Sequence, residues 1–87
     1  MPNIKQQEKR VRTAARERME NLRFRSTAKT LMKRLERAVD DGDATTIASE
    51  HRELVRLLDR AASRGALHKN TVARRKARAA KLVSTRQ

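Results

Sequence analysis

The sequence contains no cysteine, tryptophan or tyrosine, and Phe24 is its only aromatic residue. The absence of cysteine excludes disulfides and thiolate metal sites. A single aromatic side chain excludes the stacking of bases on aromatic platforms as the main means of binding nucleic acid. Nowhere do about 18 apolar residues follow one another, as a membrane-spanning helix would need. Because the first residues also lack the apolar run of a signal peptide, we expect a cytoplasmic protein.

Side chains suited to catalysis are equally scarce. His51 and His68 are far apart in the sequence and have no cysteine beside them, so a zinc site is not expected. His51 lies among apolar positions, where a packed histidine is the common outcome, and His68 is suited to a hydrogen bond with backbone or phosphate. The sequence has no glycine-rich phosphate loop and no nucleophile paired with a base. We therefore expect a protein that is not an enzyme and uses no cofactor, metal or small-molecule substrate.

The charge of the chain is strongly one-sided. Its 87 residues include 23 Lys and Arg against 10 Asp and Glu, which gives a net charge of +13 and a pI near 11.7. This balance favours a nucleic-acid partner first and an anionic membrane second. Residues 1–37 carry +8, residues 38–59 carry −4 and residues 60–87 carry +9. We expect the acidic middle to point away from a polyanion and both ends of the chain to contact it.

Glycine and proline indicate where the helices end. Residues 3–41 contain neither and are rich in good helix formers, which predicts one long helix. Gly42 suits the C-terminal cap of this helix, and Asp43 suits the N-cap of the next. Gly65 ends the second helix, and Asn70 is the expected N-cap of a third. The predicted helices, within a single domain of residues 1–87, span about residues 3–41, 44–64 and 70–83.

Apolar residues recur at helical spacing in each of these segments. In the first helix the apolar stripe changes side between Leu22 and Phe24, so one straight neighbour cannot cover both halves. Ile4, Val11, Ala15 and Leu22 form the first part of that stripe. We expect only the second half to pack against the other helices. The predicted packing stripes are Phe24, Ala28, Leu31, Leu35 and Ala38, then Ile47, His51, Leu54, Leu58 and Ala61, and finally Val72, Ala79 and Val83.

Basic residues cover much of the first half of the long helix. Lys5, Lys9, Arg12, Arg16 and Arg23 lie on one side, and Arg10, Arg18 and Arg25 flank the opposite side. Arginine predominates among them, and its planar guanidinium suits contacts with phosphate. We therefore predict that this half lies on a polyanion. The column Arg52, Arg56, Arg60 and Arg64 is expected to be a solvated flank instead.

Several short motifs run from one end of the chain to the other. The most specific is Gly65-Ala66-Leu67-His68-Lys69-Asn70 before a basic helix, followed by Ala73-Arg74 and Lys76. The others are Asn3-Ile4-Lys5, Lys9-Arg10, Arg18, Asn21, Arg25-Ser26, Thr30 and Gly42-Asp43. Together they resemble the bacterial family of small-subunit ribosomal protein S20. Gln6, Gln7, Glu8 and Ala79 depart from the pattern of that family.

The resemblance implies an all-α fold, a three-helix bundle with a long protruding N-terminal helix. It also implies a structural protein that binds 16S ribosomal RNA (rRNA) directly in the small ribosomal subunit and supports its folding and assembly. At matching positions it implies RNA contacts for Asn3, Lys5, Lys9, Arg10, Arg18, Asn21, Arg25, His68, Lys69, Asn70, Arg74 and Lys76. Charge placement alone adds Arg12, Arg16 and Arg78.

Two other kinds of partner also suit a strongly basic chain. A basic DNA-compacting protein is the main alternative, because the second helix, the Gly65 link and the third helix have the order of a helix-turn-helix. The third helix, however, lacks a clear set of base-reading side chains beyond Arg and Asn. A membrane-surface helix is the other alternative, but the apolar face of the first half is narrow and has no Trp or Tyr. We therefore expect no membrane partner.

Overall fold

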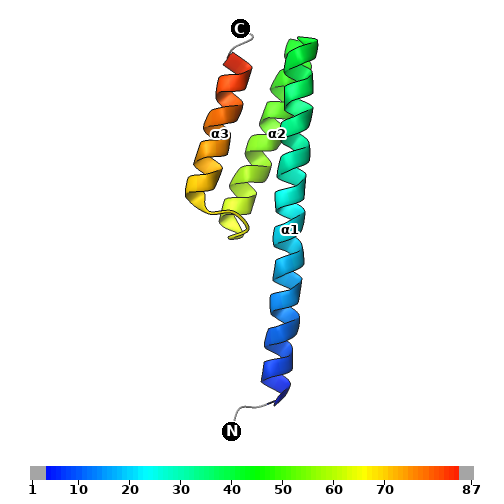
Figure 1. The fold of residues 1–87 in the computed structure, drawn as a ribbon, viewed down its shortest axis with the longest axis vertical. Coiled ribbons are helices and arrows are strands. Elements are labelled where there is room, and N and C mark those ends of the chain that lie inside the picture. The colour runs from blue at the N-terminus through cyan, green and yellow to red at the C-terminus, as the bar shows by residue number, and fades with distance from the viewer. Residues whose placement is uncertain (1–3, 85–87) are drawn as a thin grey trace.

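Three α-helices account for most of residues 4–84, the part of the chain that the computed structural model describes. They are α1 (Ile4–Asp41), α2 (Ala44–Ser63) and α3 (Lys69–Ser84), and no strand occurs within this range. α1 and α2 form an antiparallel hairpin, α3 returns alongside α2, and the first part of α1 extends beyond both (Figure 1). The predicted all-α bundle with a long protruding N-terminal helix is confirmed.

α1 is continuous because it contains neither glycine nor proline, the two residues that most weaken a helix interior. Its 38 residues correspond to about 57 Å of helix, close to the 63 Å length of the whole molecule. The radius of gyration is 17.2 Å, whereas a compact chain of this length would have a value of about 12 Å. The protein is therefore a rod with a small bundle at one end.

The turn between α1 and α2 uses the two residues predicted for it. Gly42 has a φ of +78° and donates its N–H to the carbonyl of Ala38 at 3.0 Å, which closes α1. Asp43 caps α2, because its carboxylate accepts the N–H of Thr45 at 3.1 Å and the hydroxyl of Thr46 at 2.7 Å. These hydrogen bonds, that of Thr46 foremost, hold the pKa of Asp43 below its usual value.

α2 ends in a Schellman motif around Gly65, which has a φ of +75°. Gly65 donates its N–H to the carbonyl of Ala62 at 3.1 Å, and Ala66 donates its N–H to the carbonyl of Ala61 at 2.8 Å. After this turn both Ala66 and Leu67 are buried. The short link therefore belongs to the core and fixes where α3 can begin.

The core lies between the three helices and follows the predicted stripes. Leu35, Leu54 and Leu58 are its largest fully enclosed side chains. Val39 is also buried, although the predicted stripe of α1 did not include it. The stripe residues that are buried are Ala28, Leu31, Leu35, Ala38, Ile47, Leu54, Leu58, Ala61, Val72 and Ala79, and those that are half-buried are Phe24, His51 and Val83. The prediction that only the second half of α1 packs is thus confirmed.

Candidate nucleic-acid interface

The protruding half of α1, residues 4–23, is the surface that the sequence predicts to bind a polyanion. Every residue from 4 to 20 is exposed, and neither α2 nor α3 extends alongside this segment (Figure 1). The protruding half carries seven cationic and three acidic side chains, a net charge of +4. Because the described chain covers none of it from position 4 to position 20, this helix offers its whole circumference to a partner.

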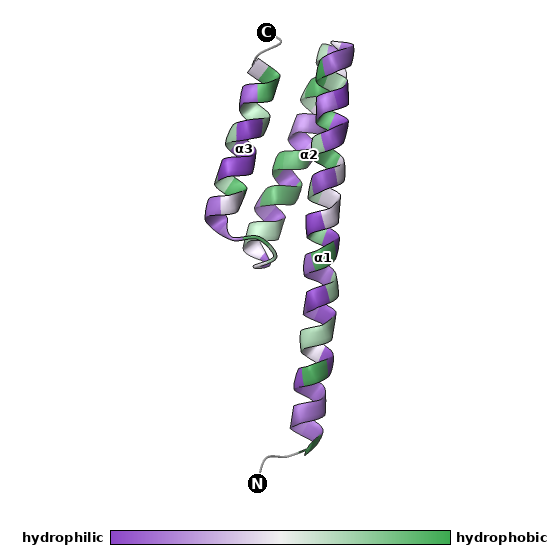
Figure 2. Cartoon of the chain, viewed as in Figure 1, coloured by the Kyte–Doolittle hydropathy of each residue, from purple (hydrophilic) through white to green (hydrophobic). Residues whose placement is uncertain are grey.

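The cations of the protruding half form two rows with apolar residues between them. By helical geometry the first row comprises Lys5, Lys9, Arg12 and Arg16, and Arg10 and Arg18 lie on the other side. The apolar residues are Ile4, Val11, Met19 and Leu22, with exposed fractions between 62% and 70%. In Figure 2 this half of α1 is largely hydrophilic, with separate hydrophobic bands along it. This stripe faces away from the side of α1 that packs, as predicted from the change of side of the apolar residues between Leu22 and Phe24.

The link between α2 and α3 meets α1 where the protruding half ends. Arg25 donates from its Nε to the carbonyl of Ala66 at 3.4 Å, so its guanidinium is directed at protein backbone. Asn21, one turn earlier on α1, is half-buried. This contact brings the start of α3 close to α1, with the side chains of His68 and Lys69 exposed. The structure therefore brings predicted contact residues of α1 and of the start of α3 close together, through a bond between Arg25 and Ala66 that spans 41 positions of the sequence.

His68 caps α3, and the prediction that Asn70 is the N-cap was wrong. The Nδ1 atom of His68 accepts the N–H of Asn70 at 3.1 Å, and its carbonyl accepts the N–H of Val72 at 3.0 Å. Ala66 and Leu67 are buried directly after the preceding turn, and α3 begins at Lys69, earlier than a cap at Asn70 would allow. The backbone hydrogen bond expected of His68 is present. Since Nδ1 accepts, Nε2 is the ring nitrogen that can donate to a partner.

Two predicted contact residues of α3 are paired with acidic side chains of the bundle. Lys76 Nζ lies 2.8 Å from Oδ1 of Asp59 on α2, and Arg78 Nη2 lies 4.0 Å from Oε1 of Glu36 on α1. All four side chains are at least 39% exposed, so each pair stabilises the bundle by about 1 kcal/mol at most. Arg74 is exposed and has no acidic partner within 4.0 Å among residues 4–84. Lys76 would have to exchange Asp59 for a phosphate.

The acidic turn between α1 and α2 lies at the end of the molecule opposite the protruding half (Figure 1). Asp40, Asp41 and Asp43 are all exposed there. The last turn of α3 lies toward the same end, so the two basic ends of the chain are far apart (Figure 1). A partner that contacts both ends, as predicted, must extend along the molecule.

Three further cations, Lys29, Lys33 and Arg75, line a groove between α1 and α3 and were not predicted. A signal for two of them was present in the sequence. Lys29 and Lys33 follow Arg18 and Arg25 in steps of seven, four and four, which keeps all four on one side of α1. The contribution of Arg75 depends on how α3 packs, which no helical periodicity reveals.

The chemistry of the described surface is that of cations and amides. Among residues 4–84, no three or more His, Asp or Glu side chains are grouped so that they could hold a metal ion. None of the three helices is both long enough and apolar enough to cross a membrane. Arginine, lysine and asparagine side chains of this kind contact phosphate and sugar, which position a protein on nucleic acid without reading its bases.

Comparison with known proteins gives a consistent result. The sequence model of a family described as Ribosomal protein S20 matches residues 2–84. A small ribosomal subunit protein bS20 of Roseiflexus sp. (strain RS-1) is 49% identical over 81 residues, which cover 93% of this chain and 88% of the relative. The protein of the same name from Kocuria rhizophila is 42% identical over 84 residues, covering 97% and 98% of the two chains. That of Cutibacterium acnes is 39% identical over 85 residues, covering 98% and 97%.

Proposed function

Because this chain belongs to the ribosomal protein S20 family, we propose that it is a structural protein of the small ribosomal subunit that binds 16S rRNA directly and supports the folding and assembly of that subunit. The observation that carries the RNA-binding part is the protruding half of α1, a basic helix that is exposed from residue 4 to residue 20. The family is one of structural ribosomal proteins, and we propose that this chain catalyses no reaction and needs no cofactor.

The protruding half binds by placing cations against phosphates on more than one side. An α-helix is about 10–12 Å across, so it fits between two RNA segments that would otherwise repel each other. The row that contains Arg12 and Arg16 faces one segment, and Arg10 and Arg18 face the other. Arginine matches a phosphate through two parallel hydrogen bonds, which fixes orientation as well as charge. Each neutralised phosphate releases counterions, so affinity falls steeply as salt rises.

The exposed apolar stripe of the protruding half also contacts RNA in this complex. Ile4, Val11, Met19 and Leu22 lie between the cationic rows, so phosphates held by the rows bring riboses over the stripe. The minor groove of an RNA helix is wide and shallow and presents sugars and base edges. Covering the stripe removes apolar surface from water, which favours binding. Recognition of this kind depends on RNA shape more than on base sequence.

The proposed contact residues are those expected from the sequence. Asn3 lies outside the described residues, and Arg25 and Lys76 already have protein partners that an RNA contact would have to share or displace. The complete set is Asn3, Lys5, Lys9, Arg10, Arg12, Arg16, Arg18, Asn21, Arg25, His68, Lys69, Asn70, Arg74, Lys76 and Arg78.

A competition assay tests this function. The full chain is bound to labelled 16S rRNA at near-physiological salt, and unlabelled 16S rRNA, random RNA of equal length and duplex DNA are added as competitors. We expect 16S rRNA to compete at the lowest concentration. Equal competition by random RNA would contradict the proposal, and stronger competition by DNA would support a DNA-compacting protein instead. Sedimentation of the chain with small ribosomal subunits in a lysate gradient provides an independent readout.

A further inference from the structure

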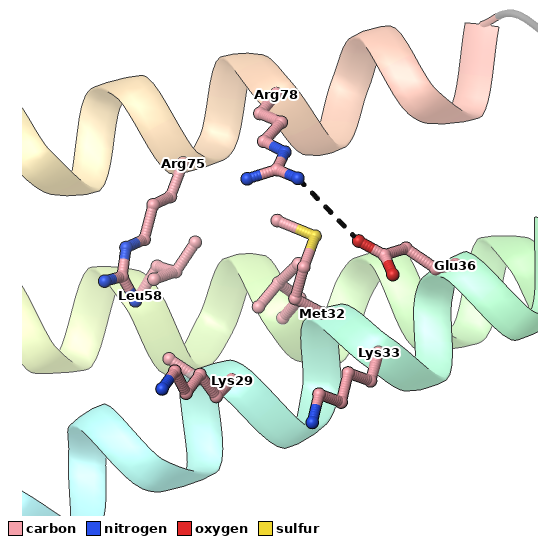
Figure 3. A pocket seen from close by; sticks show the side chains of 9 residues that line it. Lys29, Met32, Lys33, Glu36, Leu58, Arg75 and Arg78 are labelled. Atoms are coloured by element: carbon pink, nitrogen blue, oxygen red, sulfur yellow. Dashed lines mark ion pairs between the residues drawn. The ribbon is translucent and has the colours of Figure 1, made fainter.

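A groove of about 300 Å³ runs between α1 and α3 on the surface of the bundle. Figure 3 shows Arg78 reaching from α3 toward Glu36 of α1 and Arg75 reaching toward Leu58 of α2, with Met32 between α1 and α3 and with Lys29 and Lys33 on α1. The volume is at the lower end of the range for sites that hold small ligands. The lining residues are Ala28, Lys29, Met32, Lys33, Glu36, Leu54, Leu58, Arg75 and Arg78.

The charge of the groove is unbalanced. Four cationic side chains line it against one carboxylate, that of Glu36. Glu36 lies 4.0 Å from Arg78, and the other three cations have no acidic partner within 4.0 Å among the described residues. Apart from Glu36, no acidic side chain that lines the groove offsets these positive charges, so the groove favours an anionic ligand.

The apolar part of the groove is formed by Ala28, Met32, Leu54 and Leu58. Met32 is half-buried and packs against the core that contains Leu54 and Leu58, which are 1% and 0% exposed. A methionine side chain is flexible, and its sulfur makes favourable contacts with aromatic rings. The groove therefore combines a cationic rim with an adaptable apolar floor, which suits a ligand that is both anionic and aromatic.

The groove is also continuous with the proposed rRNA-binding surface. Arg18, Arg25, Lys29 and Lys33 lie on one side of α1, as their spacing requires. The distance along the helix from Arg18 to Lys33 is about 22 Å, which a few nucleotides of a single strand can span. A strand that follows the protruding half on this side is thus led to the groove.

We propose that the groove binds one unpaired nucleotide of an RNA strand. Arg75, Lys29 and Lys33 hold its phosphate, Arg78 joins them by turning away from Glu36, and the base lies on Met32. The inference rests on the proposed function for the identity of the polymer. It goes beyond that function by adding a second contact on the bundle, so that one strand is held both by the protruding half and by the groove.

The methionines provide reporters for both surfaces. Met32 lies in the groove, and Met19 lies on the protruding half with 62% of its surface exposed. The full chain is labelled with ¹³C at its methionine methyl groups and titrated with a short single-stranded oligouridine, up to millimolar concentration. We expect a saturable chemical-shift change at Met32. Inorganic phosphate at the same concentrations should leave the Met32 signal in place, because it supplies no base.

The double variant Lys33→Ala, Arg75→Ala removes two of the cations without touching a buried residue. We expect it to raise by about tenfold the oligouridine concentration that gives half of the Met32 response, because two of the four cations that line the groove are lost. The response of Met19 should be unchanged. The matched control, Arg52→Ala and Arg56→Ala, removes the same charge from exposed positions on the side of α2 opposite Leu54 and Leu58. It should leave the Met32 response within about twofold of the original.

Three results would refute the proposal that the groove binds a nucleotide. The first is a shift of Met19 without a shift of Met32, which puts the strand on the protruding half alone and leaves the proposed function standing. The second is an equal Met32 shift in the groove variant, and the third is the same shift with inorganic phosphate. A Met32 response without any preference for 16S rRNA in the competition assay would refute the proposed function and not the groove. Circular dichroism of each variant establishes that the bundle remains folded.

Discussion

Replacing Leu58 by alanine should destabilise the bundle less than the same replacement at Leu35, although both side chains are completely buried. Each change removes roughly three carbon groups from the core, at about 0.8 kcal/mol per group, or about 2.4 kcal/mol in all. A cavity term is added in proportion to the space that stays empty, and total costs for such replacements are about 2–5 kcal/mol. The two positions therefore differ only in how well their surroundings can fill that space.

The surroundings of the two leucines are different. Leu58 lines the groove beside the half-buried Met32, whose flexible side chain can move into the vacated volume. Leu35 does not line the groove. We expect a cost of about 2–3 kcal/mol for Leu58→Ala and about 3–4 kcal/mol for Leu35→Ala, both within the usual range.

Urea unfolding followed by circular dichroism measures the difference. Only the cooperative transition reports the bundle, because residues 4–20 of α1 are exposed and lose their helix gradually. Because a bundle this small has little stability to lose, the series is run in trimethylamine oxide, which strengthens apolar burial in all three proteins. An equal or larger loss for Leu58→Ala would refute the idea that Met32 and the groove allow this part of the core to relax.

Two predictions concern the turns. Asp43→Ala should lower the melting temperature, because Thr45 N–H and the Thr46 hydroxyl lose their acceptor. Since folding lowers the pKa of Asp43, the charged cap stabilises the fold at neutral pH. This contribution should be lost as the pH falls below about 3.9 and through the lower pKa of the folded state. The Asp43→Asn variant, whose side chain does not titrate, should not show this loss. Gly65→Ala should cost about 1 kcal/mol in denaturant unfolding, from its φ of +75° alone, because a Cβ there meets nothing within 4 Å. An unchanged stability in either variant would contradict the assigned caps.

The helices and their packing faces could be predicted because their signals are local. Gly42 and Gly65 are the only glycines, and both adopt the positive φ that ends a helix. The change of side between Leu22 and Phe24 separated the protruding half from the packed half, because a helix buries one face against one neighbour. These features need only the spacing of residues along one helix.

The contacts between helices could not be predicted in this way. Arg25 bonds to Ala66 across 41 positions and Lys76 pairs with Asp59 across 17, so each depends on how the bundle is assembled. The sequence alone predicts a start of α3 at Asn70, because asparagine is a favoured N-cap. In the fold, the burial of Leu67 places His68 there instead.

The most direct test of the protruding half as the rRNA-binding surface is the affinity of Arg10→Ala, Arg18→Ala for 16S rRNA over a range of salt concentrations. Both side chains are exposed, so bundle stability should not change. We predict that affinity falls by about tenfold or more and that the slope of log affinity against log salt becomes shallower by about two, because two phosphate contacts are lost. The matched pair Arg52→Ala, Arg56→Ala should have little effect. Unchanged affinity and an unchanged salt dependence in the Arg10 and Arg18 variant would show that the RNA binds elsewhere.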